Sequence, residues 1–192
     1  MFAGVIVENR PLAKEAIEAH QPFLTGWRMI HVKDYNVTDG PSYNQLMTSI
    51  KFWEALQNYE KVIIFQHDSR ILRQGIAEFL CWDYIGAPWL DSAPWARNDR
   101  KGGNGGFSLR CPKKSLDLIK MVRYLPAMGN EDVYFVHNLE KVGAKIAPHS
   151  ACKKFSVESE FTLGTFGYHQ IDAHLSPAEC EQIRQQYNFS YL

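Results

Sequence analysis

The residue whose position most clearly suggests chemistry is Asp68, which follows the apolar run KVIIFQ at residues 61–66. This run is rich in β-branched residues and predicts a buried strand, with a polar exit from His67 to Arg70. In open α/β sheets, ligands bind at the carboxyl ends of the strands. A carboxylate there can hold a hard divalent cation, which in turn holds a diphosphate. An aspartate at this place can equally cap the next turn, so both interpretations stay open.

A glycine-rich segment, GGNGGFSLR, spans residues 102–110. Glycines let a backbone approach a ligand closely and offer its amides to that ligand. The segment matches neither the phosphate-loop pattern G-x-x-x-x-G-K-[ST] nor G-x-G-x-x-G after a strand. It is therefore either a flexible loop or a ligand cradle. In the second case the candidate ligand-binding residues are Gly103, Asn104, Gly105 and Gly106.

Two neighbouring carboxylates, Glu131 and Asp132, follow Asn130, a favourable helix N-cap. Acids in a first helical turn complement the helix dipole, which is a structural reason for their presence. The catalytic interpretation is a general base that points from the helix start into a cleft. We expect the dipole to keep such a carboxylate ionised and only weakly basic. Further along, His169 offers an imidazole that suits Mn²⁺ or a phosphate oxygen, although a lone histidine is more often structural.

In this order, the four features resemble nucleotide-sugar glycosyltransferases of the A-type fold. More narrowly, the chain is similar over roughly residues 40–170 to an uncharacterised family of glycosyltransferase-like domains. The motifs that carry this resemblance are Gln66-His67-Asp68-Ser69, YIGAPW at 84–89, GNGGFSLR at 103–110 and EDV at 131–133. GNGGFSLR is the most specific of them.

The resemblance implies an inverting transfer of a sugar from a nucleotide-sugar, with a UDP-sugar as the expected donor and a glycan or other hydroxyl compound as the acceptor. Asp68 corresponds to the metal-binding acid of the Asp-x-Asp motif, and His169 to a late ligand of the same Mn²⁺ or Mg²⁺. Asp132, or failing that Glu131, corresponds to the catalytic base. Gln66 and the glycine-rich segment are expected to border the donor.

One departure from the family pattern is Arg70, which stands where the second acid of Asp-x-Asp is expected. A cation would then be held by one carboxylate, one imidazole, diphosphate oxygens and water. The alternative is a cation-independent enzyme in which Arg70 is the counter-charge of the diphosphate. Two other classes stay open, a non-catalytic module that binds a nucleotide-sugar or glycan on the same fold, and a metal-dependent phosphohydrolase. The latter lacks the multi-carboxylate cluster that two-metal hydrolysis needs.

The elements that must position these residues follow from hydrophobic periodicity and capping signals. We predict strands at 2–7, 27–32 and 61–66, short strands near 144–147 and 155–158, and an irregular stretch at 83–107. We predict helices after Pro11, from an N-cap at Ser42 through Trp53, over 112–125, over 130–142, and after the capping box Ser176-Pro177-Ala178-Glu179. The early alternation of strand and helix predicts one α/β domain over residues 1–192, with a Rossmann-like, mostly parallel central sheet flanked by helices, a compact A-type glycosyltransferase fold.

Composition limits the partners. Twenty-one basic and 21 acidic residues cancel, so no electrostatic footprint for nucleic acid is present. The four cysteines are widely spaced without a C-x-x-C pair, and we expect free thiols. The apolar N-terminal run reaches a charge at Glu8, too short for a signal peptide or a membrane span. We therefore expect a cytoplasmic protein.

Overall fold

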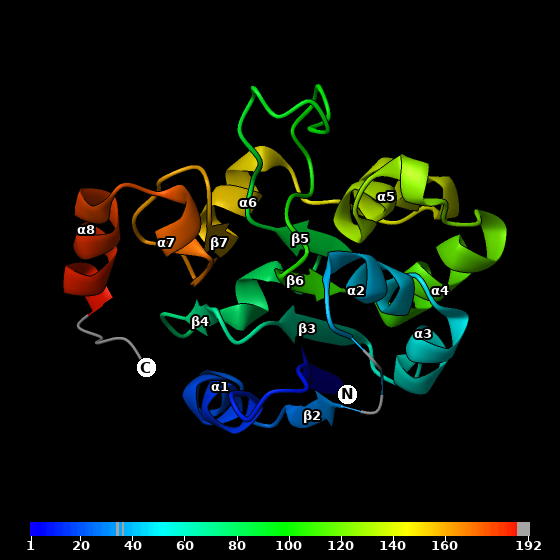
Figure 1. The fold of residues 1–192 in the computed structure, drawn as a ribbon, viewed down its shortest axis with the longest axis horizontal. Coiled ribbons are helices and arrows are strands. Elements are labelled where there is room, and N and C mark those ends of the chain that lie inside the picture. Colours follow the sequence, from blue (N-terminus) through cyan, green and yellow to red (C-terminus); the bar gives the residue numbers. More distant parts are fainter. Residues whose placement is uncertain (34, 36, 188–192) are drawn as a thin grey trace.

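The computed structural model describes residues 1–33, 35 and 37–187, and its centre is a five-stranded sheet of order β2-β1-β3-β6-β5 (Figure 1). Its strands are β1 (Phe2–Val7), β2 (Arg28–Val32), β3 (Lys61–Phe65), β5 (Tyr84–Gly86) and β6 (Phe107–Arg110). β1 pairs in parallel with β2 and β3, whereas β6 runs antiparallel to β3 and β5. A smaller sheet has the order β4-β8-β7 and is formed by β4 (Ser69–Ile71), β7 (Ser156–Val157) and β8 (Gly167–His169).

The predicted α/β fold with a central sheet flanked by helices is confirmed, but the sheet is mixed rather than Rossmann-like, with two parallel and two antiparallel strand pairs. In the central sheet, parallel pairing is found where helices cross over between strands. Helix α1 (Ala13–His20) joins β1 to β2, and α2 (Gly40–Met47) with α3 (Ile50–Leu56) joins β2 to β3. Segment 87–106 joins β5 to β6 without a helix, and strands that pair without a crossover are antiparallel.

The remaining helices lie in the second half of the chain. They are α4 (Pro112–Met121), α5 (Glu131–Asn138), α6 (His149–Phe155), α7 (Ile171–His174) and α8 (Pro177–Tyr187). Single turns of 3-10 helix are found at η1 (Gln21–Phe23), η2 (Ile76–Phe79), η3 (Pro126–Met128) and η4 (Leu139–Val142). The α8 capping box is confirmed, since the Ser176 amide donates to Glu179 Oε2 at 2.9 Å.

The helix predicted from an N-cap at Ser42 to Trp53 is two helices, and its start is different. Asp39 is the N-cap of α2: it accepts from the Ser42 amide, and Ser42 Oγ accepts from the Asp39 amide in return. Ser49 then caps α3 by accepting from the amide of Phe52. The break changes the direction of the chain, but the apolar sides of both helices still face the core, because Met47 and Trp53 are both buried.

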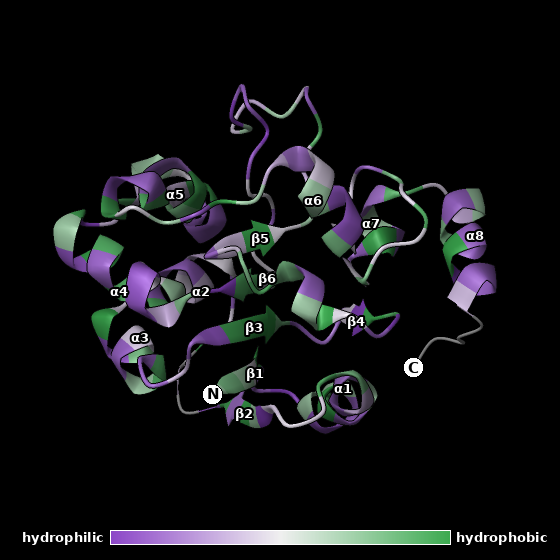
Figure 2. Cartoon of the chain, turned by 180° about the vertical axis from the view of Figure 1, so that it is seen from behind, coloured by the Kyte–Doolittle hydropathy of each residue, from purple (hydrophilic) through white to green (hydrophobic). Residues whose placement is uncertain are grey.

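Both faces of the central sheet are covered, which explains why β1 and, after Lys61, β3 are continuous apolar runs. Val62 and Ile64 pack with α2, α3, α4 and α5 in one core cluster. Ile63 and Phe65 pack with α1 and α6 in a second cluster on the opposite face. Figure 2 shows the contrast between hydrophobic strands such as β3 and β5 and the hydrophilic outer sides of the helices. A third cluster lies around α8 and the small sheet.

Other boundaries differ by a few residues. The predicted strand near 144–147 is only an isolated bridge from Ile146 to Tyr84, and that near 155–158 is β7. The stretch at 83–107, predicted to be irregular, contains β5. None of the helices among the described residues is long and apolar enough to cross a membrane. The four cysteines are free thiols, as predicted. The predicted single domain covers residues 1–192, and its last residues, 188–192, lie outside the described part.

Candidate functional site

The site is at the carboxyl edge of the central sheet, where strand order reverses. The chain passes from β1 to β2 on one side, and β3 lies on the other side of β1. Ligands bind in open α/β sheets at such a switch point. A cavity of about 760 Å³ is found here, lined by Glu8 and Arg10 after β1, by Gln66 and Asp68 after β3, and by Tyr43 of α2. Asp68 therefore follows the carboxyl end of a central strand, as predicted, and lines a cavity there.

Asp68 and His169 lie together, although 100 residues separate them in the chain. The small sheet pairs Ser69 with His169, and the His169 Nε2 atom lies 3.4 Å from Asp68 Oδ1 and 3.0 Å from Gln66 Oε1. On the other side of the ring, Nδ1 lies 2.8 Å from Glu158 Oε1. The imidazole is thus oriented by one carboxylate, Glu158, towards a second carboxylate and an amide oxygen.

This cluster is strongly charged. Burial by itself lowers the pKa of His169, but hydrogen bonds to Asp68 and Glu158 outweigh burial and raise the pKa to about 9. Burial raises the pKa of Asp68, yet hydrogen bonds from His169 and Gln170 dominate and lower it to about 2. Near neutral pH the His169 imidazolium therefore lies beside the ionised carboxylate of Asp68.

The donor atoms around Asp68 suit a hard cation only in part. The Asp68 Oδ1 atom is buried, and apart from its ion pair with His169 Nε2 at 3.4 Å it has no polar partner among the described residues. Carboxylate, amide oxygen and neutral imidazole are ligands that Mn²⁺ accepts, and a histidine ligand commonly has a second carboxylate behind it, as Glu158 is here. Because His169 is protonated near neutral pH, a cation would have to displace its Nε2 proton in order to bind. Within the described part of the chain, however, no group of three or more His, Cys, Asp or Glu side chains could hold a metal by itself. Any cation would depend on a ligand for the rest of its coordination.

Arg10 and Glu8 were missed by sequence reasoning. The Arg10 guanidinium binds Glu8 through two hydrogen bonds of 2.7 and 2.8 Å, and its Nη2 atom lies 2.8 Å from His67 Nδ1. These residues place an Arg10–Glu8 ion pair on the wall of the 760 Å³ cavity, which the carboxylates of Asp39 and Asp68 also line. The available signal was the polar sequence Glu8-Asn9-Arg10 at the exit of the first predicted strand, the same signal that identified Asp68.

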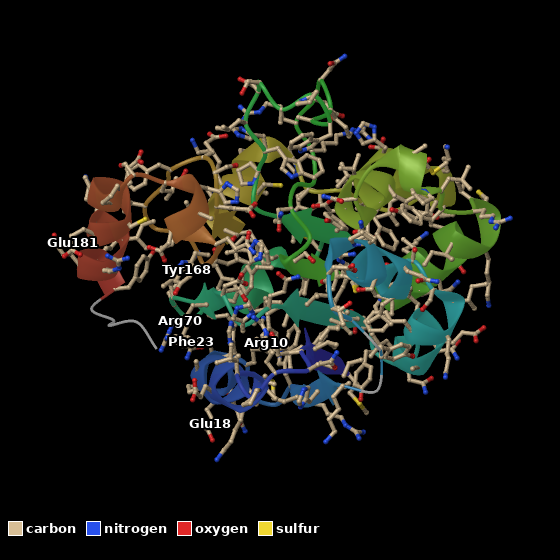
Figure 3. The ribbon with its side chains drawn as sticks, viewed as in Figure 1. Arg10, Glu18, Phe23, Arg70, Tyr168 and Glu181 are labelled. Atoms are coloured by element: carbon tan, nitrogen blue, oxygen red, sulfur yellow. The ribbon has the colours of Figure 1, made fainter. Side chains whose placement is uncertain are left out.

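Arg70, the predicted counter-charge of a diphosphate, lines a separate cavity of about 480 Å³ together with Tyr168, His67 and Asp68. Arg70 and Tyr168 face each other across β4 and β8, and Figure 3 labels both beside β4. The two cavities share the turn at His67 and Asp68. Arg10 therefore lines the cavity at the switch point, and Arg70 the adjoining one.

The glycine-rich segment is a packing element. Its amides bond within the protein: that of Gly105 donates to Asp132 Oδ2 at 3.2 Å, and that of Gly106 to Asn104 Oδ1 at 2.7 Å. Gly103 has a φ of +113°, which favours glycine. Gly103, Gly105 and Gly106 are buried, and Asn104 is partly exposed. Because their neighbours are protein groups, these glycines allow close approach of the chain to itself.

We expect Gly106→Ala to destabilise the fold and to displace His169. A Cβ at Gly106 would overlap the His169 ring, and overpacking of this kind typically costs about 1–3 kcal/mol. Thermal unfolding of the variant measures this loss. Gly40→Ala is the matched control, since nothing lies within 4 Å of a Cβ at Gly40. A Gly106→Ala protein as stable as the control would show that the loop is not packed as described.

Asp132 lines a third cavity, of about 640 Å³, on the other side of the Asp68–His169 cluster. Burial and the neighbouring charge of Glu131 raise the pKa of Asp132 to about 7, against the opposing effects of hydrogen bonds from Val133 and Gly105 and of the Arg110 charge. The expectation that the helix dipole keeps this carboxylate weakly basic is wrong, because desolvation outweighs the dipole of a helix of only 8 residues. A carboxylate with a pKa near neutrality is suited to general base catalysis.

Glu131, the other predicted base, is 2% exposed and bonds Arg110 through two hydrogen bonds of 2.6 and 2.8 Å. Arg110 is itself fully buried, with its guanidinium 4.9 Å from the centre of the Tyr84 ring and 5.2 Å from that of Phe135. Such a pair has no contact with solvent or with the three cavities described above. The geometry therefore favours Asp132 over Glu131 as a base.

Gln170, which sequence reasoning also missed, connects the cavities. Its side chain borders all three of them, and its amide nitrogen donates to Asp68 Oδ2 at 2.8 Å. Its φ is +47°, a left-handed conformation that Arg100 alone shares among the described non-glycine residues. Strained backbone of this kind is concentrated at functional sites. The 760 and 640 Å³ cavities thus adjoin at Gln170, with Asp68 on one side and Asp132 on the other.

Comparison with known proteins gives a family and a fold. The family described as Protein of unknown function (DUF5672) matches residues 26–189, and no curated protein matches the sequence. A glycosyltransferase involved in the glycosylation of the major capsid of PBCV-1 superposes with a TM-score of 0.53 over 94% of this chain and 98% of its own, at 12% identity. Protein A197 from STIV has a TM-score of 0.46 over 72% of this chain and 78% of its own, at 14% identity. The likeness to the PBCV-1 protein shows a shared fold.

Proposed function

Because the chain belongs to DUF5672, a family of proteins of unknown function, we propose its function from the site: a glycosyltransferase that moves a sugar from a nucleotide-sugar to an acceptor hydroxyl. The observation that carries this proposal is the pair of adjoining cavities at Gln170. One presents the Arg10 guanidinium and groups that could hold a metal, and the other a carboxylate with a pKa of about 7. A transfer between two substrates needs this division, with a phosphate-binding group on one side and a base on the other.

The donor in this proposal occupies the 760 Å³ cavity at the switch point. Its diphosphate lies near Arg10, whose guanidinium offers fixed donors to phosphate oxygens. Asp68, His169 and Gln66 would hold Mn²⁺ or Mg²⁺ together with the diphosphate, and the cation would supply charge stabilisation for the leaving group. A UDP-sugar is the first donor to test, as the resemblance of the sequence motifs to nucleotide-sugar glycosyltransferases implies.

The chemistry is an inverting displacement. Asp132 accepts the proton of the acceptor hydroxyl as the oxygen attacks the anomeric carbon, and the bond from that carbon to the diphosphate oxygen breaks. The developing negative charge on the nucleoside diphosphate is stabilised by Arg10 on the opposite side. Gln170, bonded to Asp68, orients the groups between the two substrates.

Transfer of labelled sugar from nucleotide-sugars to a panel of hydroxyl acceptors tests the proposal directly. Formation of a glycoside with inverted anomeric configuration supports it. Donor binding without turnover on any acceptor indicates instead the binding module, which the replacement of the second motif acid by Arg70 favours. Rapid cleavage of the diphosphate to a sugar phosphate, with no acceptor, indicates a phosphohydrolase.

We expect Asp68→Asn to weaken Mn²⁺-dependent binding of a UDP-sugar by tenfold or more, while binding of uridine changes little. The carboxylate serves the cation and diphosphate, and uridine lacks both. Thermal shift measures each affinity, since a ligand at a hundredfold excess over its Kd stabilises a protein by about 2.7 kcal/mol. Equal losses for the two ligands would assign Asp68 to the local fold. Asp172→Asn is a matched control on α7, because Asp172 lines only the cavity of Arg70.

A further inference from the structure

The segment between β5 and β6 forms one wall of the 640 Å³ cavity that contains Asp132. In Figure 1 it rises from the sheet between α5 and α6. Two of its large apolar side chains are unusually exposed for their type, Leu90 at 43% and Trp95 at 49%, whereas Trp89 is only 9% exposed. A half-exposed indole on the rim of a cavity offers a flat apolar face to whatever enters it.

The segment is anchored, so that Trp95 has a defined place. Arg97 bonds Glu140 at 2.9 Å and the Val136 carbonyl at 3.1 Å. Arg100 pairs with Glu160, which also binds His149. The carbonyl oxygen of Trp95 itself lies 2.8 Å from His137 Nε2. These contacts fix Trp95 and the residues that follow it against α5 and η4 and, through Glu160, beside α6.

The polar lining of the cavity selects against negative charge. Asp132 and Glu158 contribute carboxylates, and no Lys or Arg among the described residues lines it. A phosphate or carboxylate in this cavity would face two acidic side chains and no lysine or arginine that could pair with it. Asn104 and Asn130 add neutral amides that can both donate to and accept from hydroxyl groups.

We propose that this cavity binds a neutral saccharide as the acceptor, with a sugar ring stacked on Trp95 and its hydroxyls bonded to Asp132 and the two asparagines. Sugar rings have one apolar face of C–H groups and an edge of hydroxyls, which matches an indole beside carboxylates and amides. The identification of this saccharide as the acceptor rests on the proposed function. The binding of a neutral saccharide is testable without turnover.

The test uses the full chain and tryptophan fluorescence or NMR titration with matched sugars. Methyl β-glucoside and methyl β-glucuronide share a ring and differ in charge, and lactose, maltotriose and chitobiose extend the neutral set. We expect neutral members to bind and Trp95→Ala to weaken that binding about tenfold. Met121→Ala, a side chain 62% exposed on α4, is the matched control and should bind as the wild type does.

A second variant tests the charge argument. Ser92, exposed on the rim of the same cavity, is replaced by lysine. Ser92→Lys should raise affinity for the glucuronide relative to the glucoside by about two- to fivefold, the effect of one partly exposed charge pair. Preference of the wild type for the glucuronide, no binding of any neutral saccharide, or wild-type binding by Trp95→Ala would each overturn the proposal.

The outcomes also separate this inference from the proposed function. Saccharide binding at Trp95 without transfer from any donor would leave the ligand assignment intact and remove the enzyme activity. Transfer to an anionic sugar or a peptide hydroxyl, unaffected by Trp95→Ala, would retain the activity and remove the neutral saccharide.

Discussion

Asp132→Asn should lower turnover by roughly 10²–10⁴-fold, the usual contribution of a positioned proton-transfer group, while donor affinity stays at the wild-type value. The reason is location: Asp132 lines the 640 Å³ cavity and is absent from the lining of the cavity assigned to the donor. Steady-state kinetics with separate titration of the donor measures both quantities. Asp117→Asn, which removes a carboxylate from the exposed side of α4, is the matched control.

The pH profile gives a second measurement of the same residue. Because the base must be ionised, kcat/KM should fall as the pH drops through about 7, the pKa of Asp132. The pKa is raised in the folded state, so the folded state binds more protons than the unfolded one between about pH 4 and 7. Wild-type stability therefore falls as the pH rises through that window, whereas Asp132→Asn lacks this dependence. Wild-type turnover in the variant, with an unchanged acid limb, would rule out Asp132 as the base.

Glu131→Gln should lower the free energy of unfolding by about 3–5 kcal/mol, because it leaves the buried Arg110 guanidinium without its counter-charge. For a chain of this size each kcal/mol corresponds to about 2–4 °C, so the melting temperature should fall by roughly 6–20 °C. Differential scanning calorimetry measures this change. A double replacement, Arg110→Met with Glu131→Met, removes both charges and should restore much of the loss.

The same variant reports on Asp132. The Glu131 charge is one cause of the raised pKa of Asp132, so its removal should move the acid limb of kcat/KM to lower pH. Glu131 is thus a positioning residue that tunes the base without touching substrate. If Glu131→Gln retains wild-type stability and instead abolishes turnover with no shift of the pH profile, Glu131 and not Asp132 would be the base.

The sequence alone determined the elements whose signals are local. Six residues without a charge, from Phe2 to Val7, and the run before Gln66 require burial on both faces, and they are the neighbouring strands β1 and β3. The capping box at Ser176 sets the start of α8, because its donors and acceptors lie within three residues. Asp68 was identifiable for the same reason, since a strand end can be seen without knowledge of its partners.

Only the tertiary structure decided what depends on distant residues. The sequence of β6 does not indicate whether the strand runs parallel or antiparallel to its neighbours. Its pairing with Ile63 of β3 and Ile85 of β5 makes it antiparallel to both. The sequence also did not show which of Glu131 and Asp132 is held in an ion pair. Arg110 lies on another element, β6, and its guanidinium binds Glu131. The pKa of Asp132 was predicted in the wrong direction, since the dipole is a property of the local helix and burial a property of the whole fold. Glu158 and Gln170 reach the site through the small sheet and its flanking turns, where no local pattern marks them.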